Sequence, residues 1–323
     1  MAQRVPLAAI RADLDQLATG GEGIVYSVRS QPNVVYKEYK VNVRPTLNVV
    51  ALEELADLGS RVTPSDWSQI SSRTSWPHTL VVDGTHPTGF LMNRIDNRFY
   101  KRYGLVKNPR RVLCEWNHIV YQSQPLGAGM MTEIPRLETK QKLELINDLA
   151  NTIATLHRHG IIVGDISGRN LLWTLDPEPQ VLIIDCDSFR VEGKRGTSPS
   201  KQSPYWTDEL AIGRDTDEAS DCHKIAIAAY RAIWNEPSRP PSASDVAKSQ
   251  RADIPDEIRA LIAAGLASTQ RPSAAEWVAC FEKVNRFGGR VVLSTSQSSN
   301  PSSLQPGASV PRNPPGRPRL KLS

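Results

Sequence analysis

The chain has 323 residues, of which 39% are hydrophobic and 23% charged, a composition typical of a globular protein of one or two domains. No apolar run approaches the ~18 residues that span a bilayer, and charges interrupt the N-terminus too early for a signal peptide. The four cysteines form no C-x-x-C pair, so neither a zinc site nor a disulfide framework is indicated. We therefore expect a cytoplasmic protein without a membrane partner.

The net charge of +5 belongs to the C-terminal end of the chain. From Arg286 onward there are six basic residues and no acidic ones, so residues 1–285 carry a net charge of −1. We therefore expect no nucleic-acid partner for the folded core. Residues 289–323 are rich in Ser and Pro, which predicts a disordered basic tail. Its PRNP and PGRP segments are either plain linker or polyproline ligands for a partner.

Short β-type runs dominate the first part of the chain. They cover 23–28, 33–39, 79–84 and 88–95 and are separated by Gly, Pro, Asn and Asp turns. Between the second and third runs, Leu47, Val50 and Leu58 fit one helical stripe, which predicts a helix within 46–60. These elements predict a small sheet with one helix in residues 12–95. Residues 96–138 are poorly periodic and are interpreted as a connection with an insertion.

The pattern turns helical in residues 139–288. Strands are expected only at 171–173 and 181–184, and the predicted helices cover 140–159, 221–234, 255–267 and 273–285. The expected fold class is therefore α+β, with a small sheet-containing part followed by a larger, mainly helical part.

The stretch HGIIVGDISGRNLLW, residues 159–173, places Asp165 and Asn170 five apart in a short loop between two apolar runs. In phosphoryl transfer, an aspartate in such a loop takes the proton of an incoming hydroxyl, and an asparagine on the same turn holds a magnesium ion. Asp and Asn are also common turn formers, so this stretch taken alone favours a polar turn without chemistry.

A glycine-rich segment precedes this loop in the chain. The sequence LATGGEGIVYSV spaces Gly20, Gly21 and Gly23 so that the backbone can close over a phosphate, and Val25 follows where a ring could rest. A Gly-rich hairpin turn is the alternative.

Lys37 lies twelve residues past Val25, in a strand that is apolar around it. A lysine there points inward if it meets an anion, and is otherwise an exposed strand residue. Of the two glutamates in the following helix, Glu54 is the predicted partner of Lys37, because Val50 and Leu58 lie four residues on either side of it.

In this order, the segments resemble the eukaryotic-type protein kinases over roughly residues 15–285. ATGGEG is similar to the phosphate-covering loop, with Ala18 in place of the first glycine, and VVYK is similar to the strand that presents the nucleotide lysine. VGDISGRN resembles the catalytic loop. The resemblance implies a two-lobed protein kinase-like fold that binds ATP with magnesium or manganese, with Asp165 as base and Asn170 as metal ligand.

Further segments extend the resemblance. IIDCDSF is similar to the metal-binding D-F-G segment, which implies Asp185 as metal ligand and leaves Asp187 as the alternative. Glu209 in PYWTDEL is the implied partner of Arg271, and Asp221 is implied to tie down the catalytic loop. SWPHTLVVDG and GFLMNRI resemble a bacterial subgroup of kinase-like proteins, sometimes fused to helix-hairpin-helix modules. The same resemblance assigns Val25 and Met92 to the nucleotide site.

Departures from the kinase pattern concentrate in the two loops. Val163 and Gly164 stand where the family has histidine and arginine, Ser167 replaces the lysine, and Cys186 and Asp187 replace phenylalanine and glycine. Arg169, four residues after Asp165, is the predicted replacement for the missing lysine as the cation near the γ-phosphoryl oxygens. An exposed loop arginine is the alternative.

The residues together predict a protein kinase that transfers the γ-phosphoryl group of ATP to Ser or Thr of an unidentified protein substrate. One alternative is a pseudokinase that binds nucleotide or a partner without transfer. The other is a small-molecule phosphotransferase of related fold, because such enzymes share the G-D-x-x-x-x-N form of the loop.

Overall fold

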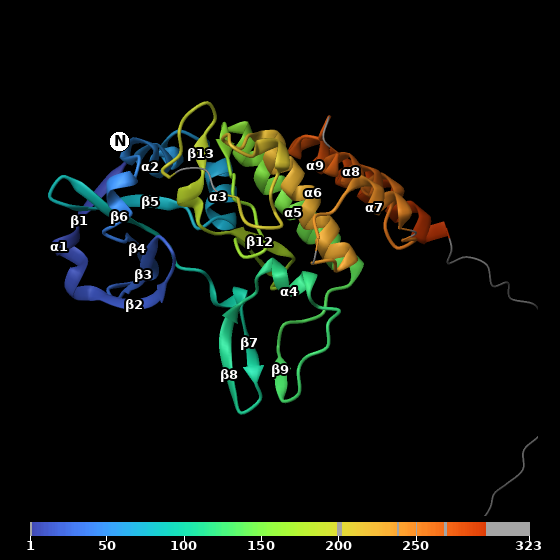
Figure 1. The fold of residues 1–323 in the computed structure, drawn as a ribbon, viewed down its shortest axis with the longest axis horizontal. Helices are drawn as coiled ribbons and strands as arrows, with labels where there is room; N and C mark the ends of the chain where they lie inside the picture. The colour runs from blue at the N-terminus through green and yellow to red at the C-terminus, as the bar shows by residue number, and fades with distance from the viewer. Residues whose placement is uncertain (1, 199–201, 238, 250, 268–269, 295–323) are drawn as a thin grey trace, which may run out of the picture. The chain divides into compact units, whose positions relative to one another are not determined.

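The computed structural model describes residues 2–198, 202–237, 239–249, 251–267 and 270–294, with side chains up to residue 286. Contacts between residues divide the chain into two units, Met1–Val284 and Asn285–Ser323. The first unit consists of a six-stranded sheet followed by a mainly helical part, which confirms the expected α+β class (Figure 1). Among the described residues, no helix is both long and apolar enough to cross a bilayer.

The six-stranded sheet has the order β1-β5-β6-β4-β3-β2. Neighbouring strands are antiparallel, except that β1 pairs with β5 in parallel. Two of these strands are not predicted from the sequence, because β1 and β2 are sheet edges that are largely exposed and lack an apolar alternation. The strands are β1 (Gln3–Pro6), β2 (Leu14–Thr19), β3 (Gly23–Val28), β4 (Gln31–Tyr39), β5 (Pro77–Asp83) and β6 (His86–Asn93).

Helix α2 (Val49–Ala56) is shorter than predicted and buries a different face. The side chain of Asn48 caps the helix by accepting a hydrogen bond from the backbone N–H of Ala51. Leu52 and Leu55 are buried, whereas Val50 is 65% exposed. The predicted stripe is therefore wrong, because two of its three members lie outside the α-helix.

A second helix between β4 and β5, α3 (Pro64–Arg73), is absent from the sequence prediction. Thr63 caps its N-terminus, and Ile70 is its only buried residue. The segment PSDWSQISSR is mainly polar, so no apolar period reveals it. Trp67 of this helix packs edge-on against Trp76, which joins α3 to the main core.

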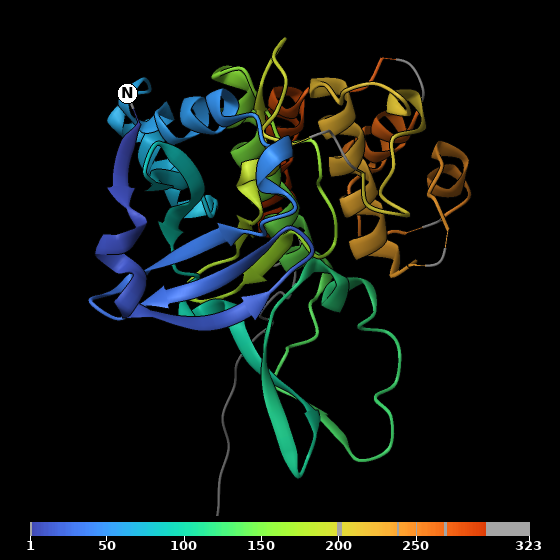
Figure 2. The same ribbon diagram turned by 60° about the vertical axis from the view of Figure 1, so that its left-hand side comes forward.

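Residues 96–138 contain a small sheet of order β8-β7-β9 and helix α4 (Trp116–Val120). Figure 2 shows this three-stranded sheet as a structure separate from the six-stranded one. The insertion was expected, but its strands were not. They are β7 (Tyr100–Leu105), β8 (Asn108–Leu113) and β9 (Met130–Thr132).

The mainly helical part is built around α5 and α6, which pack against each other. Both helices have wide buried faces, so their apolar periodicity predicts them correctly. Two pairs of short antiparallel strands lie between them in the sequence, β10 with β13 and β11 with β12. The helices are α5 (Thr139–Arg158), α6 (Glu218–Trp234), α7 (Ala243–Lys248), α8 (Asp256–Leu266) and α9 (Ala274–Ser294), and the strands are β10 (Ile161–Ile162), β11 (Leu171–Thr174), β12 (Gln180–Ile183) and β13 (Arg190–Val191).

The C-terminal tail was predicted to be disordered from residue 289. Helix α9 continues to Ser294, so the first residues of that predicted tail are helical. Residues 295–323, which include the PRNP and PGRP segments, lie outside the described residues.

Candidate active site

The glycine-rich turn between β2 and β3 covers one side of a pocket. The backbone N–H of Gly20 donates to the carbonyl oxygen of Gly23 at 2.8 Å and closes the turn. A Cβ on Gly23 would lie 2.7 Å from the carbonyl oxygen of Glu38, so β3 and β4 can approach this closely only at glycine. Gly20, Gly21, Gly23 and Val25 all line the pocket. Ala18 is exposed on β2 and does not line it.

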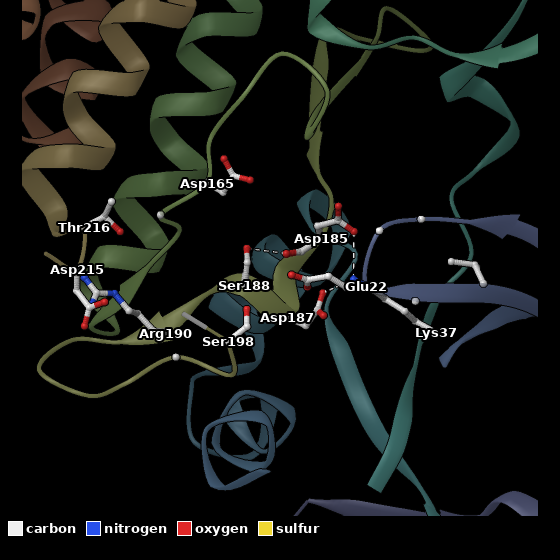
Figure 3. A pocket seen from close by; sticks show the side chains of 16 residues that line it. Glu22, Lys37, Asp165, Asp185, Asp187, Ser188, Arg190, Ser198, Asp215 and Thr216 are labelled. Carbon is white, nitrogen blue, oxygen red and sulfur yellow. Dashed lines mark hydrogen bonds and ion pairs between the residues drawn. The ribbon is translucent and has the colours of Figure 1, made fainter. Parts of the chain in front are cut away.

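Lys37 reaches from β4 into this pocket, as Figure 3 shows. Its Nζ lies 2.7 Å from Oδ1 of Asp187 and 3.3 Å from Oδ1 of Asp185. Burial by itself would lower the pKa of Lys37, but the charge of Asp187, followed by that of Asp185, raises it well above the ordinary lysine value. The side chain is therefore a permanently charged ammonium group, suited to binding phosphate oxygens.

The predicted ion pair between Lys37 and Glu54 does not form. Glu54 instead accepts a hydrogen bond from Lys194 at 2.7 Å, and the neighbouring Glu53 pairs with Arg4. The prediction is wrong because the face of α2 that turns inward is apolar, so its glutamates reach other cations. Met92 packs with Tyr39, Leu52 and Phe90 and is not among the residues that line the pocket.

Asp165 and Asn170 are held close together. Nδ2 of Asn170 donates to the carbonyl oxygen of Asp165 at 2.9 Å and to its Oδ2 at 3.2 Å. On the other side of the carboxylate, Oδ1 accepts hydrogen bonds from the backbone N–H of Ser203 at 3.1 Å and from its hydroxyl at 2.9 Å. Asp165 lines the pocket with its orientation fixed by contacts on both oxygens.

The backbone before Asp165 is fixed by buried charges from α6. Asp221 accepts hydrogen bonds from the backbone N–H groups of Val163 at 2.7 Å and Gly164 at 2.8 Å, as predicted. Lys224, which is fully buried, donates to the carbonyl oxygen of Gly164. Gly164 has a φ of +77°, and a Cβ there would lie 3.0 Å from Oγ1 of Thr216. The site therefore favours glycine where kinases usually have arginine.

Asn170 and Asp185, the two predicted metal ligands, lie next to the start of β11 and just after the end of β12. The backbone N–H of Ile184 donates to the carbonyl oxygen of Asn170 at 2.9 Å, so Asp185 directly follows the residue that pairs with Asn170. Asn170 itself is not among the residues that line the pocket. The Asp185 side chain is 56% exposed and lines the pocket. Both oxygens of Asp187 are instead engaged, one by Lys37 and one by the Tyr39 hydroxyl. Asn170 and Asp185 therefore fit magnesium, which prefers oxygen ligands, better than Asp187 does.

Arg190, Asp215 and Thr216 lie at the end of the pocket opposite Lys37 (Figure 3). Nη1 of Arg190 lies 3.0 Å from Oδ2 of Asp215, and its buried Nε has no hydrogen-bond partner among the described residues. Arg169, by contrast, is exposed and does not line the pocket, so the structure does not bring it to the predicted position. Sequence reasoning missed Arg190 because it lies in a strand of only two residues.

The residue that binds Arg271 is Asp208 and not the predicted Glu209. Nη1 of Arg271 lies 2.7 Å from Oδ2 of Asp208, and Nη2 lies 2.9 Å from Oδ1. Asp208 also accepts a hydrogen bond from the backbone N–H of Leu210 as the cap of a short 3₁₀ helix, which turns its side chain inward. Glu209 is exposed.

The six-stranded sheet and the helical part both contribute residues to the pocket. Together they define a protein kinase-like fold. A solved structure with this fold is the ROP18 kinase domain in complex with AMP-PNP and sucrose. It matches with a TM-score of 0.55 and 16% identity, over 88% of this chain and 82% of that one. No known family profile matches the chain.

Curated proteins give the same assignment. Protein kinase YegI of Escherichia coli K12 is 22% identical over 251 residues, which cover 74% of this chain and 34% of that protein. A probable LIM domain-containing serine/threonine-protein kinase of Dictyostelium discoideum is 26% identical over 199 residues, 57% of this chain and 19% of that protein. The chain thus spans about a third or less of the length of these relatives. In sequence and in fold, the chain is similar to proteins of the protein kinase-like superfamily.

Proposed function

We propose that the chain is an ATP-dependent protein kinase that transfers the γ-phosphoryl group to a Ser or Thr hydroxyl of a protein substrate. The observation that carries the proposal is that Lys37, Asp165 and Asp185 line one pocket beneath the glycine-rich turn, with Asn170 bonded to Asp165. These residue types are the ones that phosphoryl transfer requires.

Each residue has a distinct task in this proposal. Bound magnesium-ATP supplies the phosphoryl group, and Asp185 and Asn170 would hold its metal ion. The ammonium group of Lys37 binds phosphate oxygens. Asp165 orients the attacking hydroxyl and accepts its proton. The hydroxyl of Ser203 lies 2.9 Å from Oδ1 of Asp165, which supports a serine or threonine hydroxyl as the group that this carboxylate receives.

A protein substrate is favoured over a small molecule by the segment after the pocket. The buried pair of Asp208 with Arg271 fixes this segment to the helical part, and hydrogen bonds to Asp221 fix the backbone before Asp165. In the protein kinases that the chain resembles, these contacts support the surface on which a protein substrate binds.

The described cysteines are all free thiols, which supports a reducing, cytoplasmic setting.

Nucleotide binding without transfer is the second candidate. It is favoured by the loss of the catalytic-loop lysine, because Ser167 is buried and Arg169 is exposed outside the pocket. Arg190 lines the pocket together with Asp165, so it is the residue best placed to supply the positive charge that the missing lysine would give.

A transfer assay separates the two candidates. The purified chain is incubated with magnesium and γ-labelled ATP, alone and with a generic protein substrate, and the phosphorylated residues are identified by mass spectrometry. We expect phosphoserine or phosphothreonine in the wild type and none in Asp165→Asn. Nucleotide binding without any Asp165-dependent label would support the second candidate and refute the first.

A further inference from the structure

We propose that Asp187, rather than a glutamate of helix α2, positions Lys37 for the nucleotide, so that nucleotide binding does not depend on an ion pair with this helix. The inference rests on the proposed nucleotide-binding function. It adds Asp187 and Tyr39 as positioning residues and identifies the 185–188 segment as the element that controls the lysine.

Asp187 is held between two residues of the same strand. Lys37 and Tyr39 are two positions apart on β4, so their side chains leave the same face of the sheet. Oδ1 of Asp187 lies 2.7 Å from Nζ of Lys37, and Oδ2 accepts a hydrogen bond from the Tyr39 hydroxyl at 2.9 Å. The side chains of Asp187 and Lys37 are 6% and 11% exposed. Both oxygens of the Asp187 carboxylate have partners, and the ion pair with Lys37 is buried, so Asp187 holds Lys37 in a defined position. We call Asp187 the lysine anchor.

Helix α2 supplies no charge to this anchor. The carboxylates of Glu53 and Glu54 face Arg4 and Lys194 in partly exposed ion pairs. Pairs of this kind contribute little to stability. The part of α2 nearest to β4 is apolar, because Leu52 packs with Tyr39 and Phe90. The helix therefore contacts this face of the sheet through apolar side chains.

The anchor and the metal ligand belong to one short turn. A 3₁₀ helix, Cys186–Ser188, follows Asp185 directly, and the backbone N–H of Ser188 donates to the carbonyl oxygen of Asp185 at 3.1 Å. The buried thiol of Cys186 donates to the carbonyl oxygen of Ile183 at 3.3 Å. This turn directs Asp187 into the interior and leaves Asp185 exposed in the pocket. Any displacement of the turn must move the lysine anchor and the metal ligand together.

In kinases, placement of the helix that bears the glutamate controls whether the lysine is in position. Here the lysine partner lies two residues after the metal-binding aspartate. A rearrangement of α2 that broke only its glutamate pairs would leave Lys37 in place. Regulation through that helix should therefore have little effect on nucleotide affinity.

The test compares nucleotide affinity, with magnesium and in EDTA, using a fluorescent ATP analogue as the probe. Asp187→Asn keeps the side-chain shape and removes the charge, and Glu54→Gln is the matched control in α2. We expect at least tenfold weaker binding for Asp187→Asn under both conditions, and less than a twofold change for Glu54→Gln. Asp185→Asn should weaken binding more in magnesium than in EDTA, because its contact with Lys37 at 3.3 Å is longer than that of Asp187. This difference distinguishes the anchor from the proposed metal ligand.

A second background separates positioning from a general effect on folding. In Lys37→Met there is no ammonium group to position, so adding Asp187→Asn should weaken nucleotide binding no further. Tyr39→Phe removes one hydrogen bond and keeps all charges. Tyr39→Phe should weaken nucleotide binding about two- to fivefold in the wild-type background and not at all in the Lys37→Met background. If Asp187→Asn does not fold, Tyr39→Phe is used in its place.

Three results would overturn the inference while leaving the proposed function intact. These are unchanged affinity in both Asp187→Asn and Tyr39→Phe, a loss confined to magnesium-containing buffer, or a tenfold loss in Glu54→Gln. A wild-type chain that binds no nucleotide under either condition would instead refute the proposed function, and the inference with it.

Discussion

The buried pair of Asp208 and Arg271 gives the sharpest prediction for stability. The two side chains are 1% and 7% exposed and are joined by two hydrogen bonds of 2.7 and 2.9 Å. Replacing Arg271 by Met keeps much of the apolar volume but leaves the carboxylate buried without its counter-charge. Breaking a buried ion pair on one side destabilises a protein by about 3–5 kcal/mol. We therefore expect Arg271→Met to lower the free energy of unfolding by this amount in urea titrations at pH 7.

The matched control is Glu209→Gln. Glu209 is the adjacent carboxylate and the partner that the sequence predicted, but it is exposed, so its substitution should change the free energy of unfolding by less than about 0.5 kcal/mol. The double variant Asp208→Asn/Arg271→Met should lose less than the sum of the two single losses, because each single change leaves one polar partner buried. A loss below about 1 kcal/mol in Arg271→Met, or an equal loss in Glu209→Gln, would refute the reasoning.

The same pair makes the free energy of unfolding depend on pH. Burial opposes ionisation of Asp208, but hydrogen bonds from Arg271 and Ser220 outweigh it and lower the pKa to about 2. Since an unfolded aspartate titrates at ~3.9, the pair stabilises the fold fully above about pH 5 and loses that contribution as the pH falls towards 2. At 1.36 kcal/mol per pKa unit, the loss is about 2–3 kcal/mol. Asp208→Asn should lack this component of the acid dependence in urea titrations between pH 5 and 2.

Three further substitutions test the candidate active site. Asp165→Asn should keep ATP affinity within about twofold and reduce transfer by at least about a thousandfold, because the carboxylate orients the hydroxyl and does not hold the nucleotide. Wild-type phosphorylation of the substrate by this variant in a radiolabel assay would contradict the role. Arg169→Ala should leave turnover at saturating magnesium-ATP within about threefold, since the side chain is exposed outside the pocket, and a hundredfold loss would restore its sequence-based role. Gly164→Ala should lower the free energy of unfolding by about 1–2 kcal/mol in chemical denaturation, because residue 164 has a positive φ and an added Cβ would crowd Oγ1 of Thr216. An unchanged denaturation midpoint would show that the loop relaxes to fit the methyl group.

Local patterns in the sequence determined much of the helical part. Helices α5, α6 and α8 bury continuous faces, so their apolar periods reflect the packing that stabilises them. The sequence also placed the segments that hold Asp165 and Asp185, both of which line the pocket. Asn170 directly precedes β11 and Asp185 follows β12 closely, and the pairing of these two short strands puts Asn170 opposite Ile184, the residue before Asp185.

The partners of the charged groups were decided only by the tertiary structure. Spacing along the chain cannot choose between the adjacent carboxylates Asp208 and Glu209, because the 3₁₀ helix that follows turns the first inward and the second outward. Nor can it show that Lys37 meets Asp187, which lies 150 residues away, instead of Glu54. The energy of an ion pair depends on the distance between the charges and on their removal from water, and both follow from how the sheet and the 185–188 turn pack.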